Sequence, residues 1–265
     1  MKRAPMKRAP MKPLLEPALA KHPMLRQTLL VAATVMALSA CGDREAERQA
    51  AAAAQAAVIE QEADALAKKY DSAVASSDWD MARIHGVALV SQYPQSSAAA
   101  RIEPALEAVK AKAVSAREQR RMEALWDYAQ VAAKGGTQRS ASILSQAPVD
   151  VDGSGAKPVQ LVFRDHPEWK RSSYLVLQAS DFARACYKSC SVTVVADGAP
   201  PRRMAAHRPD TDEATAMFID DNKALWRLLR KTKVVSIEFP VKAGGTRTAV
   251  FETGGLDGSQ MPGWD

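Results

Sequence analysis

The spacing of apolar residues changes near the middle of the chain, and this change predicts two structural regions. In residues 57–77, apolar or small side chains recur at steps of three and four, as on one face of a long helix. The series is Ile59, Ala63, Leu66, Tyr70, Ala73 and Ser77. A second helix is expected between Asp78, a typical N-terminal cap, and Tyr93-Pro94, because proline disfavours the helical conformation of the preceding residue.

Residues 96–136 continue the helical spacing. Ile102, Leu106, Val109 and Ala113 recur at steps of four and three, which predicts one long helix or two. Gly135-Gly136 is the expected stop, since glycine favours the end of a helix.

Beyond residue 158 the period becomes two, which is typical of strands. Six alternating runs predict strands at residues 159–165, 173–178, 191–197, 202–208, 234–240 and 246–252. Gly244-Gly245 joins the last two as a hairpin. Between the fourth and fifth runs, residues 211–233 are expected to form a helix that covers one sheet face with Phe218, Leu225, Trp226 and Leu229.

These patterns predict an α+β protein, with N-terminal α-helices followed by a small, mainly antiparallel sheet and one helical crossover. The expected organisation has six parts, of which residues 137–158 are a polar linker that includes a short alternating run at 140–146. The others are a signal segment 1–40, a stalk 41–56, a helical region 57–136, an α+β domain 159–257 and a tail 258–265.

Residues 29–40 form an apolar run that stops at Cys41. The run is shorter than the ~20 apolar residues of a transmembrane helix, and Arg26 precedes it, as in a secretory signal peptide. The exit sequence Leu38-Ser39-Ala40-Cys41 resembles a bacterial lipobox. This resemblance implies removal of residues 1–40 and a Cys41 that is lipidated and binds the bilayer. The alternative is a buried cysteine in an ordinary N-terminal helix.

Two further expectations follow from the lipoprotein resemblance. Met24 opens a compact signal, so translation is expected to begin either there or at Met1. Gly42 follows the cysteine, and in lipoproteins of Gram-negative bacteria an aspartate at that position favours retention in the inner membrane. The resemblance therefore implies an outer-membrane location, with the body facing the periplasm.

Charge changes its meaning once the signal is removed. The whole chain has 36 Lys and Arg against 30 Asp and Glu, but residues 1–40 hold seven of the bases and one of the acids. The remaining chain has 29 of each and is formally neutral. Nucleic-acid binding needs a basic surface, so we expect no nucleic-acid partner.

Cys186 and Cys190 remain as a pair if Cys41 is acylated, and an exported protein permits disulfides. We predict that they are bonded to each other. A metal site would need further ligands, and nothing in the sequence places His166 or His207 beside the pair. The three intervening residues also differ from the two of a C-x-x-C redox motif.

The polar clusters contain residue types that enzymes use. Asp165-His166 and Ser172-Ser173 supply the residue types of a hydrolase triad, but no G-x-S-x-G or S-x-x-K motif surrounds the serines. The acids Asp210, Asp212, Glu213, Asp220 and Asp221 lack the spacing of a calcium loop. We therefore predict no catalytic residues, no metal site and no cofactor.

Two resemblances bear on function. Residues 77–102, with Trp79, Ala82, Leu89 and Tyr93-Pro94, resemble about one tetratricopeptide repeat, whereas a plain helical hairpin is the alternative. Residues 159–257 are similar to type VI secretion accessory proteins and to the invasion-associated locus B group, through SYLVL, an SDF before paired cysteines, and FETGGL.

These resemblances imply an envelope accessory or binding role rather than an enzyme. We expect a non-enzymatic envelope lipoprotein that acts as an interaction or scaffold protein, with envelope proteins as partners. The alternative is a periplasmic domain that binds a small ligand or glycan, or hydrolyses one at a site without a known motif.

Overall fold

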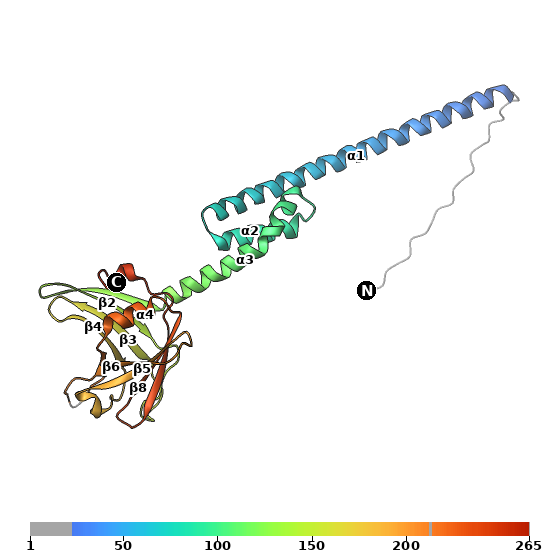
Figure 1. Cartoon of the computed structure of the whole chain (residues 1–265). Helices are drawn as coiled ribbons and strands as arrows, with labels where there is room; N and C mark the ends of the chain where they lie inside the picture. The colour runs from blue at the N-terminus through green and yellow to red at the C-terminus, as the bar shows by residue number, and fades with distance from the viewer. Residues whose placement is uncertain (1–22, 212–213, 265) are drawn as a thin grey trace, which may run out of the picture.

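The computed structural model describes residues 23–211 and 214–264, and the side chains from residue 44 onward. Residues 1–22 of the expected signal segment fall outside the described residues, whereas residues 23–40 belong to the first helix; their side chains and that of Cys41 are not described. Three helices come first, α1 (Pro23–Ala75), α2 (Trp79–Gln92) and α3 (Ser97–Glu123), and a β-sheet region follows (Figure 1). The α+β class is therefore confirmed. Among the described residues, no helix combines the length and apolar character needed to cross a membrane.

The three helices pack around small side chains. Ala63, Ala67 and Tyr70 of α1 are buried against α2 and α3, and so are Ala82 and Leu89 of α2. A Cβ on Gly86 would lie 2.7 Å from Leu106 Cδ1 and 3.1 Å from the Tyr70 ring, so glycine allows this close approach. Asp78 caps α2 by accepting from Met81 N, as predicted, and Tyr93 is its C-cap. The expected buried stripe of α3 is confirmed at Ile102, Leu106, Val109 and Ala113.

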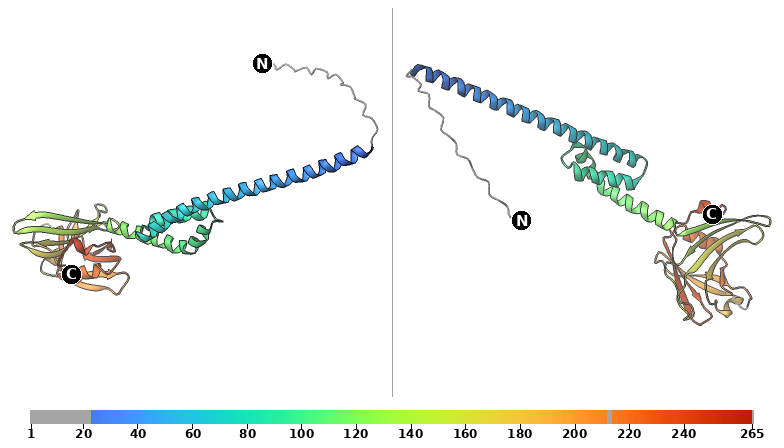
Figure 2. Two further views of the ribbon diagram at one scale, coloured as in Figure 1. Left: turned by 90° about the horizontal axis from the view of Figure 1, so that it is seen from above. Right: turned by 180° about the vertical axis from the view of Figure 1, so that it is seen from behind.

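The first part of α1 stands apart from the body. Its described side chains at residues 44–59 are exposed, and α1 extends away from the other elements in both views of Figure 2. At 1.5 Å per residue, this exposed part is about 24 Å long. This exposed part overlaps the expected stalk, residues 41–56, and continues three residues beyond it.

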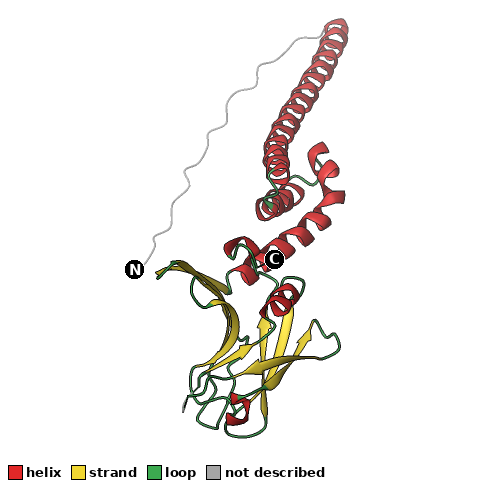
Figure 3. Cartoon of the chain, turned by 60° about the vertical axis from the view of Figure 1, so that its left-hand side comes forward, coloured by secondary structure: helices red, strands yellow, loops and turns green. Residues whose placement is uncertain are grey.

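The described strands form one antiparallel sheet in the order β1-β2-β3-β4-β7-β6-β5-β8-β9. The sheet is strongly curled, and α4 lies at the end of it that is nearer to α3 (Figure 3). The strands are β1 (Trp126–Ala133), β2 (Gly136–Leu144), β3 (Val159–His166), β4 (Lys170–Leu177), β5 (Cys190–Ala196), β6 (Arg202–His207), β7 (Ala216–Ile219), β8 (Val234–Pro240) and β9 (Thr246–Glu252), and the helix between β7 and β8 is α4 (Asn222–Leu229). All six predicted strands are present.

Two sequence predictions about helices are wrong. The helix expected to reach Gly136 ends at Glu123, and residues 126–133 form β1 instead. The helical region 57–136 therefore contains a strand, and β2 occupies the first part of the expected linker 137–158. The helix expected over residues 211–233 is confined to α4, because β7 occupies residues 216–219 and Asp221 caps α4 by accepting from Ala224 N.

The core of the sheet is aromatic. The ring of Phe163 of β3 packs edge-on against Trp226 of α4 and against Trp264 of the C-terminal tail. The ring centroids are 5.0 Å apart in the first pair and 5.4 Å apart in the second. The ring of Trp126 of β1 also lies near Phe163, with centroids 6.4 Å apart. Leu225, Trp226 and Leu229 are buried as predicted, whereas Phe218 lies on β7 and is half-buried. The tail thus forms part of the core.

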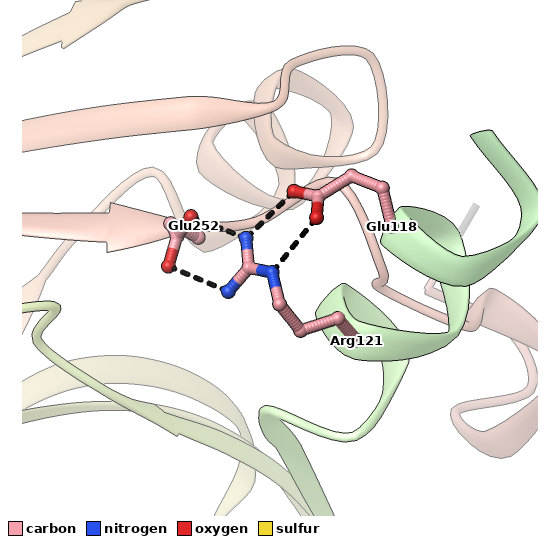
Figure 4. A network of polar contacts seen from close by, with 3 residues as sticks. All are labelled: Glu118, Arg121 and Glu252. Carbon is pink, nitrogen blue, oxygen red and sulfur yellow. Dashed lines mark hydrogen bonds and ion pairs between the residues drawn. The ribbon is translucent and has the colours of Figure 1, made fainter. Parts of the chain in front are cut away.

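A close contact joins the helical region to the sheet. Gly254 and Gly255, just after β9, lie against Met122 and Glu123 at the end of α3. Arg121 donates to Glu252 at 2.6 Å and 3.1 Å and to Glu118 at 2.7 Å and 2.9 Å (Figure 4). These carboxylates, Glu118 first, raise the pKa of Arg121 further above its ordinary value. The end of α3 therefore contacts the last strand and continues, through residues 124–125, into the first.

Candidate functional site

The two edges of the sheet differ in how they are covered. Along the β9 edge, Gln146 N donates to Val250 O at 2.7 Å, and Arg247 Nε donates to Asp150 O at 2.8 Å. Gln146 and Asp150 belong to the segment between β2 and β3, which therefore closes the curled sheet against its last strand. Because a free edge is a template for strand pairing, this cover blocks the β9 edge.

The β1 edge has no such cover. β1 pairs with β2 over eight residue pairs, and among the described residues no backbone hydrogen bond joins β1 to any other segment. On an edge strand, half of the amide and carbonyl groups point away from the neighbour and are free to pair. Residues 129–133, with the sequence AQVAA, carry no charge, and Val131 is 55% exposed. This edge is the candidate site for an added strand.

The start of β1 is held firmly while its far half is open. Trp126 is buried, and the Tyr128 ring stacks on it with centroids 6.4 Å apart. Tyr128 Oη accepts a hydrogen bond from Asp257 N at 2.7 Å, and partial burial raises the pKa of Tyr128. The open part of the edge is therefore presented on a fixed base.

Cys186 and Cys190 lie where their sulfur atoms are at disulfide distance, with Cα atoms 4.8 Å apart. Cys186 lies in a short 3₁₀ turn, Arg184–Tyr187, and Cys190 is the first residue of β5. Arg208 N donates to Cys186 O at 3.0 Å, and the buried Arg208 guanidinium donates to Phe182 O at 3.1 Å. Arg208 therefore secures the loop that carries the cysteine pair.

The residues considered for a hydrolase triad have separate contacts. His166 Nδ1 accepts from the amides of Glu168 and Trp169, and Ser173 Oγ donates to Ile219 O. Asp165 pairs with Arg171 across the β3–β4 hairpin at 3.2 Å. Ser172 Oγ is buried without a hydrogen-bond partner in the described residues. The structure therefore does not bring these groups together as nucleophile, base and orienting acid.

The acidic residues considered as cation ligands are also separated. Asp221 caps α4, Asp220 pairs with His207 at 2.6 Å, and Asp210 raises the pKa of Tyr187 through a side-chain hydrogen bond. Asp212 and Glu213 lie outside the described residues. In the described part of the chain, no three His, Cys, Asp or Glu side chains gather closely enough to hold a metal.

A row of aromatic and cationic side chains crosses the outer face of the sheet. The Arg164 guanidinium lies 5.3 Å from both the Trp169 and the Tyr174 ring centres. Tyr174 contacts Phe218 at 5.1 Å, and Phe218 stacks on His207 at 5.4 Å. Tyr174, Phe218 and His207 lie against one another in the middle of the row. These contacts stabilise the pairing of the strands and leave few ring faces open to a ligand.

Sequence reasoning missed the β1 edge because it assigned those residues to a helix. The available signal was the alternation of Trp126 and Tyr128 ahead of the Gly135-Gly136 turn. Comparisons of the chain with protein-family models, curated proteins and solved structures give no match.

Proposed function

We propose that the chain is a lipid-anchored protein of the bacterial cell envelope that acts without catalysis, as an interaction or scaffold protein. In this proposal acylated Cys41 holds it in the outer membrane, with the body facing the periplasm. An extended segment of an envelope protein is the partner, and it adds to the sheet along β1.

The uncovered β1 edge carries this proposal. Natural sheets usually block an exposed edge with lysine, proline, a bulge or a covering segment, and here β9 is covered while residues 129–133 have none of these devices. In strand addition, main-chain hydrogen bonds give affinity and alternate side chains give specificity. Each such bond contributes about 0.5–1.5 kcal/mol, so side-chain contacts of the added strand must supplement them to outweigh the entropy cost of association.

Other described features support a presenting role. The exposed part of α1 provides distance between an anchor and the body, and the contact of α3 with Gly255 fixes the sheet relative to α3. An uncharged edge fits an uncharged extended segment, because a charge opposite the alanines would lose solvent contact without gaining a partner.

The test introduces a charge on the open edge. Val131→Lys places a lysine on β1, the device by which natural sheets block edges. Leu144→Lys is the matched control, because Leu144 is 48% exposed on the neighbouring strand β2, pairs with Gln160 of β3 and lies outside the β1 edge. The tagged variants are crosslinked in living cells, and the captured proteins are quantified by mass spectrometry.

We expect Val131→Lys to reduce the captured partner at least about tenfold, which corresponds to 1.4 kcal/mol, and Leu144→Lys to leave it unchanged. Amide exchange with the isolated partner should slow at residues 129–133. Equal capture by the two variants, or unprotected β1 amides in the complex, would contradict the proposal. If the only protein captured is a second copy of this chain, the β1 edge mediates self-association and the proposed envelope partner is wrong.

A further inference from the structure

A cleft of about 550 Å³ opens between the loop after β4 and the turn between β8 and β9. Three connections form its walls: the loop after β4, the residue Thr215 just before β7, and the turn between β8 and β9. Asp152, from the β2–β3 segment, completes the lining. The volume lies within the range of about 300–1,000 Å³ that small-molecule sites occupy.

The unusual group in this cleft is Asp181. Its side chain is only 6% exposed, and its Oδ1 accepts from Ala214 N at 2.7 Å and lies 3.5 Å from the Arg208 guanidinium. Its other oxygen, Oδ2, has no hydrogen-bond partner among the described residues. A buried carboxylate oxygen without a donor is costly, so it identifies a position where a ligand donor would be favourable.

Lys242 supplies the opposite charge. Its Nζ lies 3.6 Å from Asp181 Oδ2, within ion-pair range, and its side chain is 49% exposed. The ammonium therefore reaches the carboxylate from the solvent side and is free to turn toward a ligand. The distance between these two charges is comparable to the separation of the amine and the carboxylate in an α-amino acid.

The rest of the lining adds donors and acceptors. Ser180 and Thr215 carry hydroxyls, and Asp152 is a second carboxylate. Arg208 already faces Asp181 Oδ1, so Asp181 Oδ2 and Asp152 are the acceptors left for a ligand amine, and Lys242 gives an accompanying carboxylate its partner. Ser180 also has a φ of 67°, a conformation that is uncommon outside glycine and that gathers at ligand sites.

The wall that holds Asp181 is rigid. Lys242 N donates to Asp181 O at 2.9 Å, and Phe182 bridges to Val241 as an isolated β-pair. Arg208 binds Phe182 O from the other side, next to the cysteine pair. The Asp181 carboxylate is therefore held in place before any ligand arrives, which lowers the entropy cost of binding.

We propose that this cleft binds a compact zwitterion of the α-amino acid class, with its ammonium on Asp181 and Asp152 and its carboxylate on Lys242. The ligand replaces the pairing of Lys242 with Asp181 by two charge-assisted contacts of its own. This site is separate from the β1 edge and does not depend on the function proposed above.

Isothermal titration of the full chain tests the proposal with three related probes. L-Alanine carries both charges, L-alaninamide only the amine and N-acetyl-L-alanine only the carboxylate. L-Alanine should bind at least tenfold more tightly than either. Titration at about 10 mM detects Kd values near 1 mM, which correspond to about −4 kcal/mol. No L-alanine binding at that concentration overturns the proposal, as does equal binding of either single-charge probe.

Variants separate the cleft from a general charge effect. Lys242→Ala should weaken L-alanine about tenfold without weakening L-alaninamide, because it also removes the cation that competes for Asp181, and Thr215→Val should weaken both amines. Lys231→Ala is the control, since it removes the same charge from an exposed position outside the cleft lining. Asp181→Asn is avoided because it disturbs a buried ion pair and the fold. Equal weakening by Lys231→Ala and Lys242→Ala would refute the assignment.

Discussion

The contact between α3 and the segment after β9 predicts that Gly255→Ala destabilises the protein strongly. Gly255 is buried, and a Cβ built on it would lie closer than 3.0 Å to three backbone atoms, Glu123 N, Met122 C and Met122 O. Backbone atoms do not rotate away as a side chain does. To restore an ordinary carbon contact of about 3.5 Å, the last turn of α3 must move by roughly 1 Å.

That movement has a calculable cost. Overpacking a well-packed site costs about 1–3 kcal/mol, and a clash with backbone belongs at the upper end. At about 2–4 °C per kcal/mol for a chain of this length, 3 kcal/mol lowers the Tm by roughly 6–12 °C. The shift also displaces Arg121 from Glu252, so the two regions lose their ion pair together with their packing.

Thermal unfolding followed by tryptophan fluorescence measures the effect, because Trp126, Trp226 and Trp264 are buried in the sheet core. Gly258→Ala is the matched control: its Cβ would meet only the flexible end of Arg230, at 3.0 Å, and should change stability by less than about 0.5 kcal/mol. If Gly255→Ala unfolds at the same temperature as Gly258→Ala, the close approach of α3 to this segment is wrong.

Four further predictions concern export, the cysteine pair and a tyrosine. Cys41→Ala should leave a larger precursor without lipid label on a gel, and a correctly processed, unlabelled form would contradict lipidation. Gly42→Asp should move the protein from outer to inner membrane fractions of a sucrose gradient, and recovery of this variant in the outer-membrane fractions would contradict the expected effect of residue 42. Mass spectrometry of exported protein should find Cys186 bonded to Cys190, whereas two alkylatable thiols would argue against it. Burial raises the pKa of Tyr174, so absorbance titration should show it ionising above the ordinary value of 10.0. In the unfolded protein Tyr174 ionises at a lower pH than in the folded protein, so the folded state loses stability as pH rises above about 10. A Tyr174 that titrates at the ordinary pKa would contradict this prediction.

Local alternation was sufficient for six strands because each has one face in the core and one toward solvent. In β8, for example, Val235, Ile237 and Phe239 are buried while the residues between them are more exposed. Such a pattern lies within the strand itself, so sequence alone predicts it. The cap of α2 at Asp78 is local in the same sense.

The missed elements depend on distant contacts. Residues 124–133 are rich in alanine and continue a helical run. Residues 126–133 nevertheless form a strand, because Trp126 enters the core beside Phe163 and pairs with Ile143 of β2. β7 has four residues, too few for a periodicity to be read against the helical residues after it. Local propensity was overridden in both places by tertiary packing.

The candidate sites were invisible in the sequence for a similar reason. An edge is open or covered according to where Gln146 and Asp150 lie in space, and neither residue type indicates this. Asp181 and Lys242 meet only after the β8–β9 hairpin has folded back onto the loop after β4. The cysteine pair was the exception, since four residues of separation already keep the two sulfur atoms near each other.

The way α3 ends has a mechanical consequence. Its backbone runs directly into β1, while its last turn presses on Gly255 beside β9. A pull applied along α3 therefore reaches the sheet through the backbone at its first strand and through the Arg121–Glu252 ion pair at its last. Load shared in this way resists the sequential peeling of strands that a single point of attachment would permit.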